Sequence, residues 1–214
     1  MTVADFLTGW ESLPGNAAEY DVSHVSARSA VDGLTGARVL MLGSSVTWGY
    51  ASGGQALGEY LAARFRMRVT KEAVNGTTLS GDGSDTYVSR LQRREETYDL
   101  VVVQLSTNDA TQSRPVRAVL AALETIRAYV RRRWNAPVVV YTNTRYGSAL
   151  YGRMVDAVLQ ANFPTIDLWH TLEPEHLELY MADAIHPTRA GYVRWWAPEV
   201  EKQLILKQER GELR

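Results

Sequence analysis

The chain has 214 residues, a formal net charge of −1 at pH 7 and no cysteine. This length suits one compact domain, and the near-neutral charge argues against nucleic acid or an anionic membrane as a partner bound through bulk electrostatics. The lack of cysteine excludes disulfides, thiolate catalysis and cysteine-ligated metal centres.

Two further features bear on location. No stretch reaches the ~18 consecutive apolar residues of a membrane span. The first residues include acidic side chains and lack the apolar core of a secretory signal. We therefore expect a cytoplasmic protein with no membrane span.

Residues 1–36 come first and are irregular, since turn-forming segments such as LPGN and DGLTG interrupt them. We expect them to form an N-terminal extension packed on a main domain of residues 37–214. From residue 37 onward, apolar runs that predict strands alternate with segments of helical periodicity. In chain order these are strand 37–43, helix 54–67, strand 68–74, helix 84–96, strand 99–106, helix 114–134, strand 136–143, helix 148–162, strand 163–169 and a helix from Thr188, in which Pro198 could cause a kink.

This alternation predicts a doubly wound α/β sandwich. Four strands are nearly continuous apolar runs, which are typical of a parallel sheet covered on both faces. The segment 68–74 alternates instead, so we place it near a sheet edge. The Ser-Asp pair at 84–85 predicts a helix cap, and Pro115 suits the first turn of its helix.

Ligands of an open parallel sheet gather outside the carboxyl ends of its strands, and this chain places polar residues there. Ser45 follows the first strand, Gly76 the second and Asn108 the third, while Asp183 and His186 lie in the loop after the last strand. Taken singly, each is an ordinary turn or capping residue.

Taken together, these residues match the needs of acyl transfer by serine, which are a nucleophile, a base, an orienting carboxylate and oxyanion donors. Asp183 and His186 are three positions apart, so one turn can hold both side chains toward one site. His24, His170 and His176 have no comparable partners in the sequence.

Competing motifs are missing. The first strand is not followed by G-x-G-x-x-G, and no P-loop string occurs. The nucleophile elbow G-x-S-x-G of the α/β-hydrolases is also absent. No cluster of metal ligands is visible, so we expect neither a metal nor an organic cofactor.

The four blocks resemble those of the SGNH hydrolases, the GDSL-type esterase and lipase superfamily. GSSVTWG (43–49) is similar to the first block, NGTT to the second and STND to the third, and DAIHPTRAGY (183–192) is similar to the closing block. The resemblance implies a three-layer α/β/α, flavodoxin-like fold with a five-stranded parallel sheet. It also implies a triad of Ser45, His186 and Asp183, with an oxyanion hole formed by the Ser45 and Gly76 amides and the Asn108 side chain.

Two positions depart from the family pattern. Ser44 stands where the first block has aspartate, and Ser106 where the third has glycine. Neither change removes a chemical role, but Ser44 leaves the rigidity and pH dependence of the first loop open.

We expect a serine esterase that cleaves small acyl esters through an acyl-enzyme, with acetyl esters of carbohydrates as the first choice. Trp48, Tyr50 and Tyr146 lie near the strand ends and are candidates for the substrate pocket. A short-chain lipid esterase or thioesterase is the alternative, and a non-catalytic sugar-binding protein of the same fold stays open. Transfer to an acceptor other than water and a homo-oligomer are both compatible with the sequence.

Overall fold

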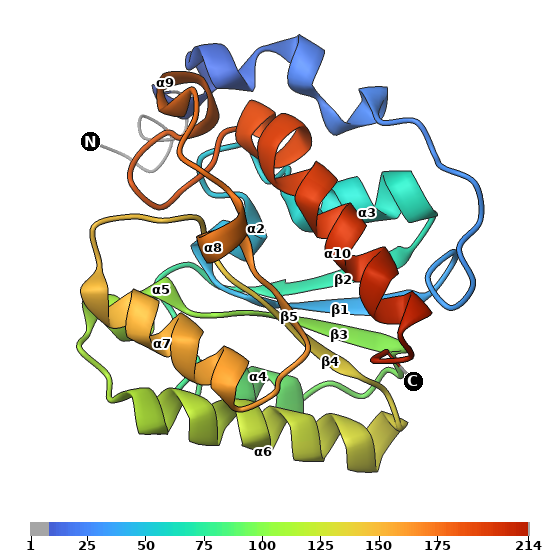
Figure 1. The fold of residues 1–214 in the computed structure, drawn as a ribbon, viewed down its shortest axis with the longest axis vertical. Helices are drawn as coiled ribbons and strands as arrows, with labels where there is room; N and C mark the ends of the chain where they lie inside the picture. The colour runs from blue at the N-terminus through green and yellow to red at the C-terminus, as the bar shows by residue number, and fades with distance from the viewer. Residues whose placement is uncertain (1–8, 214) are drawn as a thin grey trace.

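A computed structural model describes residues 9–213, and its centre is one parallel sheet. The strand order is β2-β1-β3-β4-β5, and every pairing is parallel (Figure 1). The strands are β1 (Arg38–Gly43), β2 (Arg68–Ala73), β3 (Leu100–Gln104), β4 (Val138–Tyr141) and β5 (Thr165–Ile166). The predicted five-stranded parallel sheet is confirmed, with β2 at an edge as its alternating pattern indicated.

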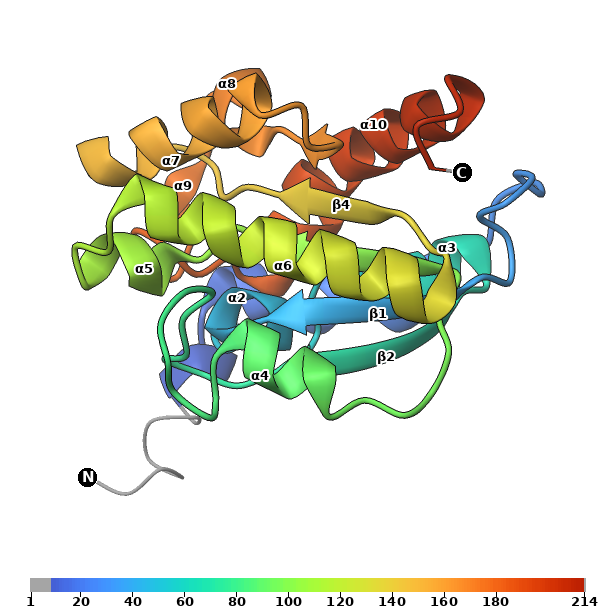
Figure 2. The same cartoon turned by 90° about the horizontal axis from the view of Figure 1, so that it is seen from below.

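Helices cover both faces of the sheet, as the nearly continuous apolar strands require (Figures 1 and 2). The helices are α2 (Ser45–Trp48), α3 (Leu57–Phe65), α4 (Tyr87–Gln92), α5 (Thr107–Thr111), α6 (Val116–Trp134), α7 (Ala149–Gln160), α8 (Leu168–Thr171), α9 (Leu177–Tyr180) and α10 (Ala197–Glu209). Helices α3 and α10 share one core cluster with alternate strand residues such as Val39 and Met41. Helices α4, α6 and α7 share the other with Leu40 and Leu42. The three-layer α/β/α sandwich is therefore confirmed.

Two local predictions were wrong. The strand expected over 163–169 ends at Ile166, because the Asp167 side chain accepts a hydrogen bond from the His170 amide and starts α8. The cap of α4 is Thr86 rather than Ser84-Asp85, and its hydroxyl accepts from the Ser89 amide.

The predicted C-terminal helix begins with a π-helical segment, η4 (Gly191–Trp196), and continues as α10. Pro198 is the second residue of α10 and follows η4 without a break in the helical backbone. A proline inside a helix disturbs the turn that precedes it, and the π-helical turn lies directly before Pro198.

The N-terminal segment forms three short turns, η1 (Pro14–Asn16), η2 (Ala18–Tyr20) and η3 (Val22–His24). It lies over the α3 and α10 side of the sandwich (Figure 1). Arg28 Nη1 forms an ion pair of 2.7 Å with Glu201 Oε1 of α10. The boundary expected at residue 36 stays a prediction.

The strand order indicates where on the sheet a ligand is expected to bind. After β1 the chain turns to β2 on one side, and then crosses to β3 on the other, so the chain reverses direction across the sheet between β1 and β3. In open α/β sheets, ligands bind outside the carboxyl ends of the strands at such a point. None of the helices within residues 9–213 is long and apolar enough to cross a membrane.

Candidate active site

Ser45, His186 and Asp183 meet at the carboxyl edge of the sheet. Ser45 Oγ lies 2.8 Å from His186 Nε2, and His186 Nδ1 lies 2.8 Å from Asp183 Oδ2. Because an ionised carboxylate can only accept hydrogen bonds, Nδ1 carries the proton of the neutral ring. Nε2 is then the acceptor for the Ser45 hydroxyl, so the three side chains form one directed chain of hydrogen bonds.

A tight turn holds Asp183 against His186. Asp183 Oδ1 accepts from the backbone amides of Ile185 and His186, at 2.7 and 2.8 Å. Asn143, just beyond β4, donates from Nδ2 to the Ile185 carbonyl at 3.0 Å and ties this turn to the sheet. The pKa of Asp183 lies below its usual value: partial burial acts to raise it, but the hydrogen bonds from His186 and the two amides outweigh this effect. Asp183 therefore stays ionised at neutral pH.

The turn that carries Ser45 is packed tightly against β3. A Cβ at Gly43 would overlap Thr47 Oγ1, so only glycine fits at the end of β1. Gln104, the last residue of β3 and fully buried, accepts at Oε1 from the Ser44 amide at 2.9 Å and from Thr47 Oγ1 at 2.9 Å. These contacts fix the backbone on both sides of Ser45.

A hydrogen bond to Thr77, the neighbour of Gly76 in the chain, holds the Asn108 side chain near Gly76. Asn108 Nδ2 donates to the carbonyl of Thr77, next to Gly76, at 2.8 Å. An amide nitrogen has two protons, so a second donor is left for a ligand. Ser45 is the first residue of α2, where the backbone N–H has no partner within the helix.

The three aromatic candidates differ in their surroundings. The Tyr50 ring lies 5.3 Å from the His186 ring, measured between centroids. Tyr146 packs on Tyr151 and Trp169. Trp48 is 45% exposed, and its ring faces β2, where Lys71 Nζ lies 4.8 Å from the ring centroid.

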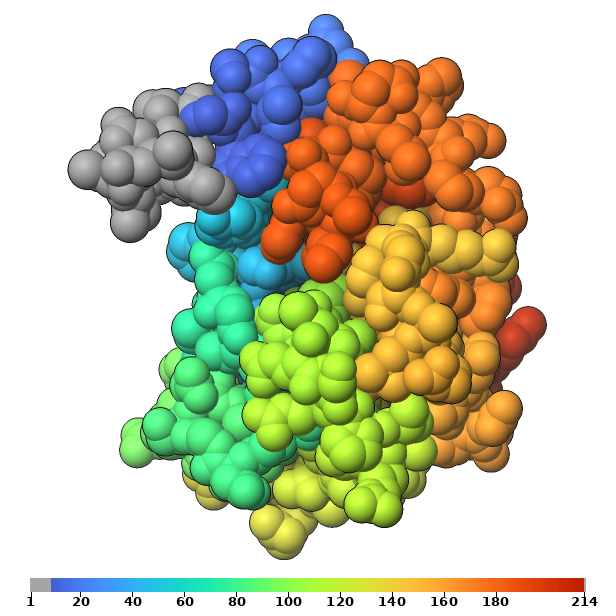
Figure 3. Space-filling model, turned by 90° about the vertical axis from the view of Figure 1, so that its left-hand side faces the viewer, coloured from blue at the N-terminus to red at the C-terminus, as the bar shows by residue number. Residues whose placement is uncertain are grey.

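Two hollows flank this cluster. One, of about 350 Å³, is mostly apolar and is lined by Thr144, Arg145, Tyr146, Leu177, Met181, Asp183 and Ala184. The other, of about 180 Å³, is polar and lies beside Gly76, with Thr77, Ser80 and Arg114 among its lining residues. Tyr146 and Asp183 thus share a cavity wall, whereas the side next to Gly76 has few apolar atoms. Figure 3 shows the face of the molecule on which the segments after β1, β2, β3 and β4 meet the closing segment near residue 185.

Comparison with known proteins identifies the family. The sequence model of the GDSL-like Lipase/Acylhydrolase family matches residues 41–194, most of the chain. The chain belongs to this family. It is therefore a member of a family of ester-hydrolysing enzymes, and the resemblance to the SGNH superfamily is confirmed. No curated protein matches the sequence.

Several solved structures share its fold. A lipolytic G-D-S-L family member from Veillonella parvula is 18% identical with a TM-score of 0.58, covering 77% of this chain and 96% of its own. TesA is 21% identical with a TM-score of 0.60, covering 78% and 97%. A variant of Axe2, an acetyl-xylooligosaccharide esterase from Geobacillus stearmophilus, is 17% identical with a TM-score of 0.60, covering 81% and 96%.

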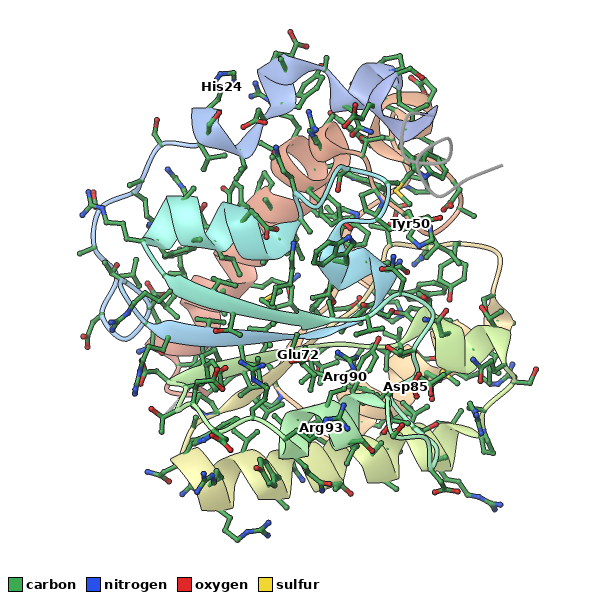
Figure 4. All side chains as sticks on the ribbon, turned by 180° about the vertical axis from the view of Figure 1, so that it is seen from behind. His24, Tyr50, Glu72, Asp85, Arg90 and Arg93 are labelled. Atoms are coloured by element: carbon green, nitrogen blue, oxygen red, sulfur yellow. The ribbon has the colours of Figure 1, made fainter. Side chains whose placement is uncertain are left out.

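The structure also shows residues around this candidate site that the sequence did not indicate. Arg90 of α4 is buried, and its guanidinium donates to the carbonyls of Gly43 at 2.7 Å and Glu72 at 2.9 Å, and to Thr77 Oγ1 at 3.1 Å. It thus joins the ends of β1 and β2 to the loop of Gly76; Figure 4 labels Arg90 beside Glu72 and Asp85. An arginine in a polar helix carries no sequence signal for such a role.

Asp109 is a second buried group that the sequence pattern did not single out. Its carboxylate accepts from the amides of Leu79 and Ser80, at 2.7 and 3.1 Å, and from the Ser80 hydroxyl. It therefore anchors the far end of the loop that begins at Gly76. The other described histidines lie elsewhere, and no three His, Asp or Glu side chains within residues 9–213 converge as a metal site would require.

Proposed function

We propose that this chain is a serine esterase that hydrolyses short acyl esters, first of all acetyl esters of carbohydrates, through an acyl-enzyme. The observation that carries the proposal is the chain of two 2.8 Å hydrogen bonds from Ser45 Oγ through His186 to Asp183. In this assignment Ser45 is the nucleophile, His186 the general base and Asp183 the group that orients the ring.

Acylation begins when Ser45 Oγ attacks the ester carbonyl and His186 Nε2 takes the hydroxyl proton. Asp183 stabilises the imidazolium that forms, since its carboxylate accepts a hydrogen bond from Nδ1–H, with 2.8 Å between Nδ1 and Oδ2. His186 then donates the proton to the leaving alcohol, and the acyl group remains on Ser45.

The oxyanion would be held by three donors, the backbone amides of Ser45 and Gly76 and the second Nδ2 proton of Asn108. Each such donor is worth about 2.7–4 kcal/mol of transition-state stabilisation. The bond from Asn108 to Thr77 supports this role because it fixes the Asn108 side chain beside Gly76.

Deacylation repeats the cycle with water as the nucleophile. His186 takes a proton from water, the hydroxide attacks the acyl carbonyl, and Ser45 leaves with the proton returned by His186. An alcohol in place of water would give acyl transfer by the same steps. None of these steps draws on a metal or an organic cofactor.

The cavities support a short acyl group and a larger alcohol. The hollow beside Gly76, on the oxyanion side, is small and polar, which disfavours a long acyl chain. The larger hollow is lined in part by Asp183, and we assign it to the alcohol because the neighbouring His186 protonates the leaving group in this mechanism. Its volume of about 350 Å³ suits a sugar ring, and Tyr146 offers an aromatic wall.

One observation favours a second candidate, a short-chain lipid esterase or thioesterase. Leu177 and Met181 make the larger hollow mostly apolar, as an alkyl group would require. A panel of acetylated xylo-oligosaccharides against p-nitrophenyl esters and acyl thioesters of increasing chain length separates the two. The highest kcat/KM on acetyl sugars is expected, and a rise in kcat/KM with chain length would favour the lipid substrate.

Ser45→Ala tests the chemistry, with the adjacent Ser44→Ala as its matched control. We expect Ser45→Ala to abolish turnover and labelling by a fluorophosphonate while the protein stays folded. Ser44 Oγ lies 3.4 Å from Gln104 Oε1 and also interacts with the buried Tyr87 hydroxyl, both outside the proposed triad, so its loss should cost less than about tenfold in kcat. A wild-type protein that the probe does not label would instead indicate a non-catalytic, sugar-binding member of the fold.

A further inference from the structure

The N-terminal segment reaches the site from outside the region that matches the family. Asn16 of η1 is 5% exposed, although it is polar and lies near the chain start. Its Nδ2 donates to the carbonyls of Ala51 at 2.7 Å and Trp10 at 2.6 Å, and its Oδ1 accepts from the Arg189 amide at 2.8 Å. One side chain thus joins three segments that are far apart in sequence.

Arg189 closes the same set of contacts from the other side. Its Nη1 donates to the Asn16 carbonyl at 3.1 Å, and its Nε donates to the Ser52 carbonyl at 3.2 Å. Figure 3 shows the blue N-terminal segment lying against the cyan segment that follows α2 and the orange-red segment near residue 185. We call Asn16, Arg189 and the carbonyls of Ala51 and Ser52 the N-terminal clamp.

Short stretches of chain connect the clamp to the two residues that exchange a proton in the proposed reaction. The turn of Ala51 and Ser52 begins at α2, where the amides of Gly49 and Tyr50 both donate to the Ser45 carbonyl at 3.0 Å. Arg189 lies three residues after His186, beyond one proline. Each end of the clamp is therefore a short, hydrogen-bonded stretch away from one of the two reacting side chains.

A second contact leads from the same segment to His186. The Trp10 ring lies 6.1 Å from the Tyr50 ring, which in turn lies 5.3 Å from the His186 ring. Both aromatic pairs have tilted or edge-to-face geometry, which favours attraction. Residues 10–16 are thus linked to His186 through the Tyr50 ring as well as through the clamp.

We propose that the N-terminal segment is a positioning device for the esterase, with Asn16 and Arg189 as positioning residues that hold Ser45 and His186 at hydrogen-bonding distance. This inference rests on the proposed function. Its physical reason is that a misplacement of about 1 Å between reacting groups can cost about 100-fold in rate. Since neither residue lines either hollow beside the site, substrate binding should be largely unaffected.

The test compares Asn16→Leu and Arg189→Met with a control in the same segment, Arg28→Met. Arg28 attaches the segment to Glu201 of α10 and has no link to Ser45 or His186 in the contacts described above. We measure kcat, KM and the rate of fluorophosphonate labelling of Ser45, at a temperature well below the unfolding midpoint of every variant. The labelling rate depends on the alignment of Ser45 and His186 and needs no knowledge of the natural ester.

We expect both clamp variants to lower kcat and the labelling rate by about 10- to 100-fold, with KM within about threefold of wild type. Arg28→Met should keep the wild-type values although it lowers the unfolding midpoint. Folded clamp variants with wild-type labelling rates would overturn the inference and leave the proposed function intact. If Asn16→Leu does not fold, Arg189→Met decides alone, and a wild-type protein that is not labelled would overturn both proposals.

Discussion

Asp183 is held in an orientation that lets it act on one tautomer of His186. Its Oδ1 is occupied by two backbone amides, which leaves Oδ2 for His186 Nδ1. In Asp183→Asn the carbonyl oxygen can keep the amide bonds, so an NH2 group would face Nδ1. The ring would then place its proton on Nε2, where it could no longer accept the proton of Ser45.

We therefore expect Asp183→Asn to lower kcat by about 10³- to 10⁴-fold with little change in stability. Steady-state kinetics and thermal unfolding of the variant test this. A variant with wild-type kcat would contradict the role assigned to Asp183. The pKa of Asp183 is lowered from its usual value of 3.8, so the carboxylate stays ionised at every pH above 3.8. Protonation of Asp183 can therefore reduce activity only below pH 3.8, and a loss of activity at higher pH comes from another group.

Asn108 is proposed to act through its side-chain amide alone. Asn108→Ala should lower kcat by about 10²- to 10³-fold while KM changes little, because the lost donor acts mainly in the transition state. The matched control is Ser106→Ala. It removes the cap of α5, because the Ser106 hydroxyl accepts a hydrogen bond from the Asp109 amide at 3.2 Å. It should cost about 1 kcal/mol of stability with kcat nearly unchanged. Equal losses of kcat in the two variants would show that α5 matters only as a structural support.

At the scale of elements, Glu201 connects α10 to α3 and to the N-terminal segment. Its carboxylate accepts from Arg28 at 2.7 Å, from Arg64 at 2.8 Å and from the Tyr60 hydroxyl at 2.9 Å. Burial acts to raise the pKa of Glu201, but the hydrogen bonds from Arg64 and Tyr60 lower it overall. A group with a lowered pKa stabilises the fold above its unfolded value and loses this effect as the pH falls through the folded value.

Glu201→Gln should therefore reduce the free energy of unfolding at neutral pH by about 1–3 kcal/mol. The difference from wild type should shrink as the pH falls below the usual glutamate value of 4.5. Urea unfolding at neutral and acidic pH measures both. Glu124→Gln, which breaks the exposed pair with Arg127, is the control and should change stability by less than about 0.5 kcal/mol. A difference that persisted unchanged in acid would argue against an ionised Glu201.

The sheet and its long helices could be predicted because their residues show clear periodicity over many positions. Helices α2, α5, α8 and α9 could not, since four or five residues give no period. Leu168 shows why such short elements cannot be predicted. It is buried in the core, as it would be in a strand, and the hydrogen bond from the His170 amide to Asp167 is what starts α8 at this position.

The candidate site was predictable for a different reason, because parallel strands bring their carboxyl ends to one edge. Polar residues after three strands could therefore be placed together with the closing loop from the order of the strands along the chain. The roles of Gln104, Arg90 and Asn16 could not be predicted in this way. Each acts on backbone groups that are distant in sequence, and only the tertiary fold brings these contacts about.

On the scale of the whole molecule, the proposed nucleophile and base come from segments 141 positions apart that pack against each other. In the core, the Tyr192 hydroxyl donates to the Val46 carbonyl at 2.6 Å and links the two segments from within. The N-terminal clamp links them from the outer side. Residues 9–36 are therefore expected to unfold together with the sheet and not as a separate unit.

Gly15 offers a test of this cooperativity, because a Cβ there would overlap the Leu179 carbonyl and Thr188 Oγ1. Gly15→Ala should lower the free energy of global unfolding by about 1–3 kcal/mol, as overpacking does in a tight core. Gly147→Ala is the control, since a Cβ at Gly147 meets nothing within 4 Å. Chemical unfolding followed by both tryptophan fluorescence and far-UV circular dichroism should give coincident transitions, shifted in Gly15→Ala alone. An unshifted main transition would mean that the segment detaches without affecting the sheet, because the strain at Gly15 would then be relieved locally before the core unfolds.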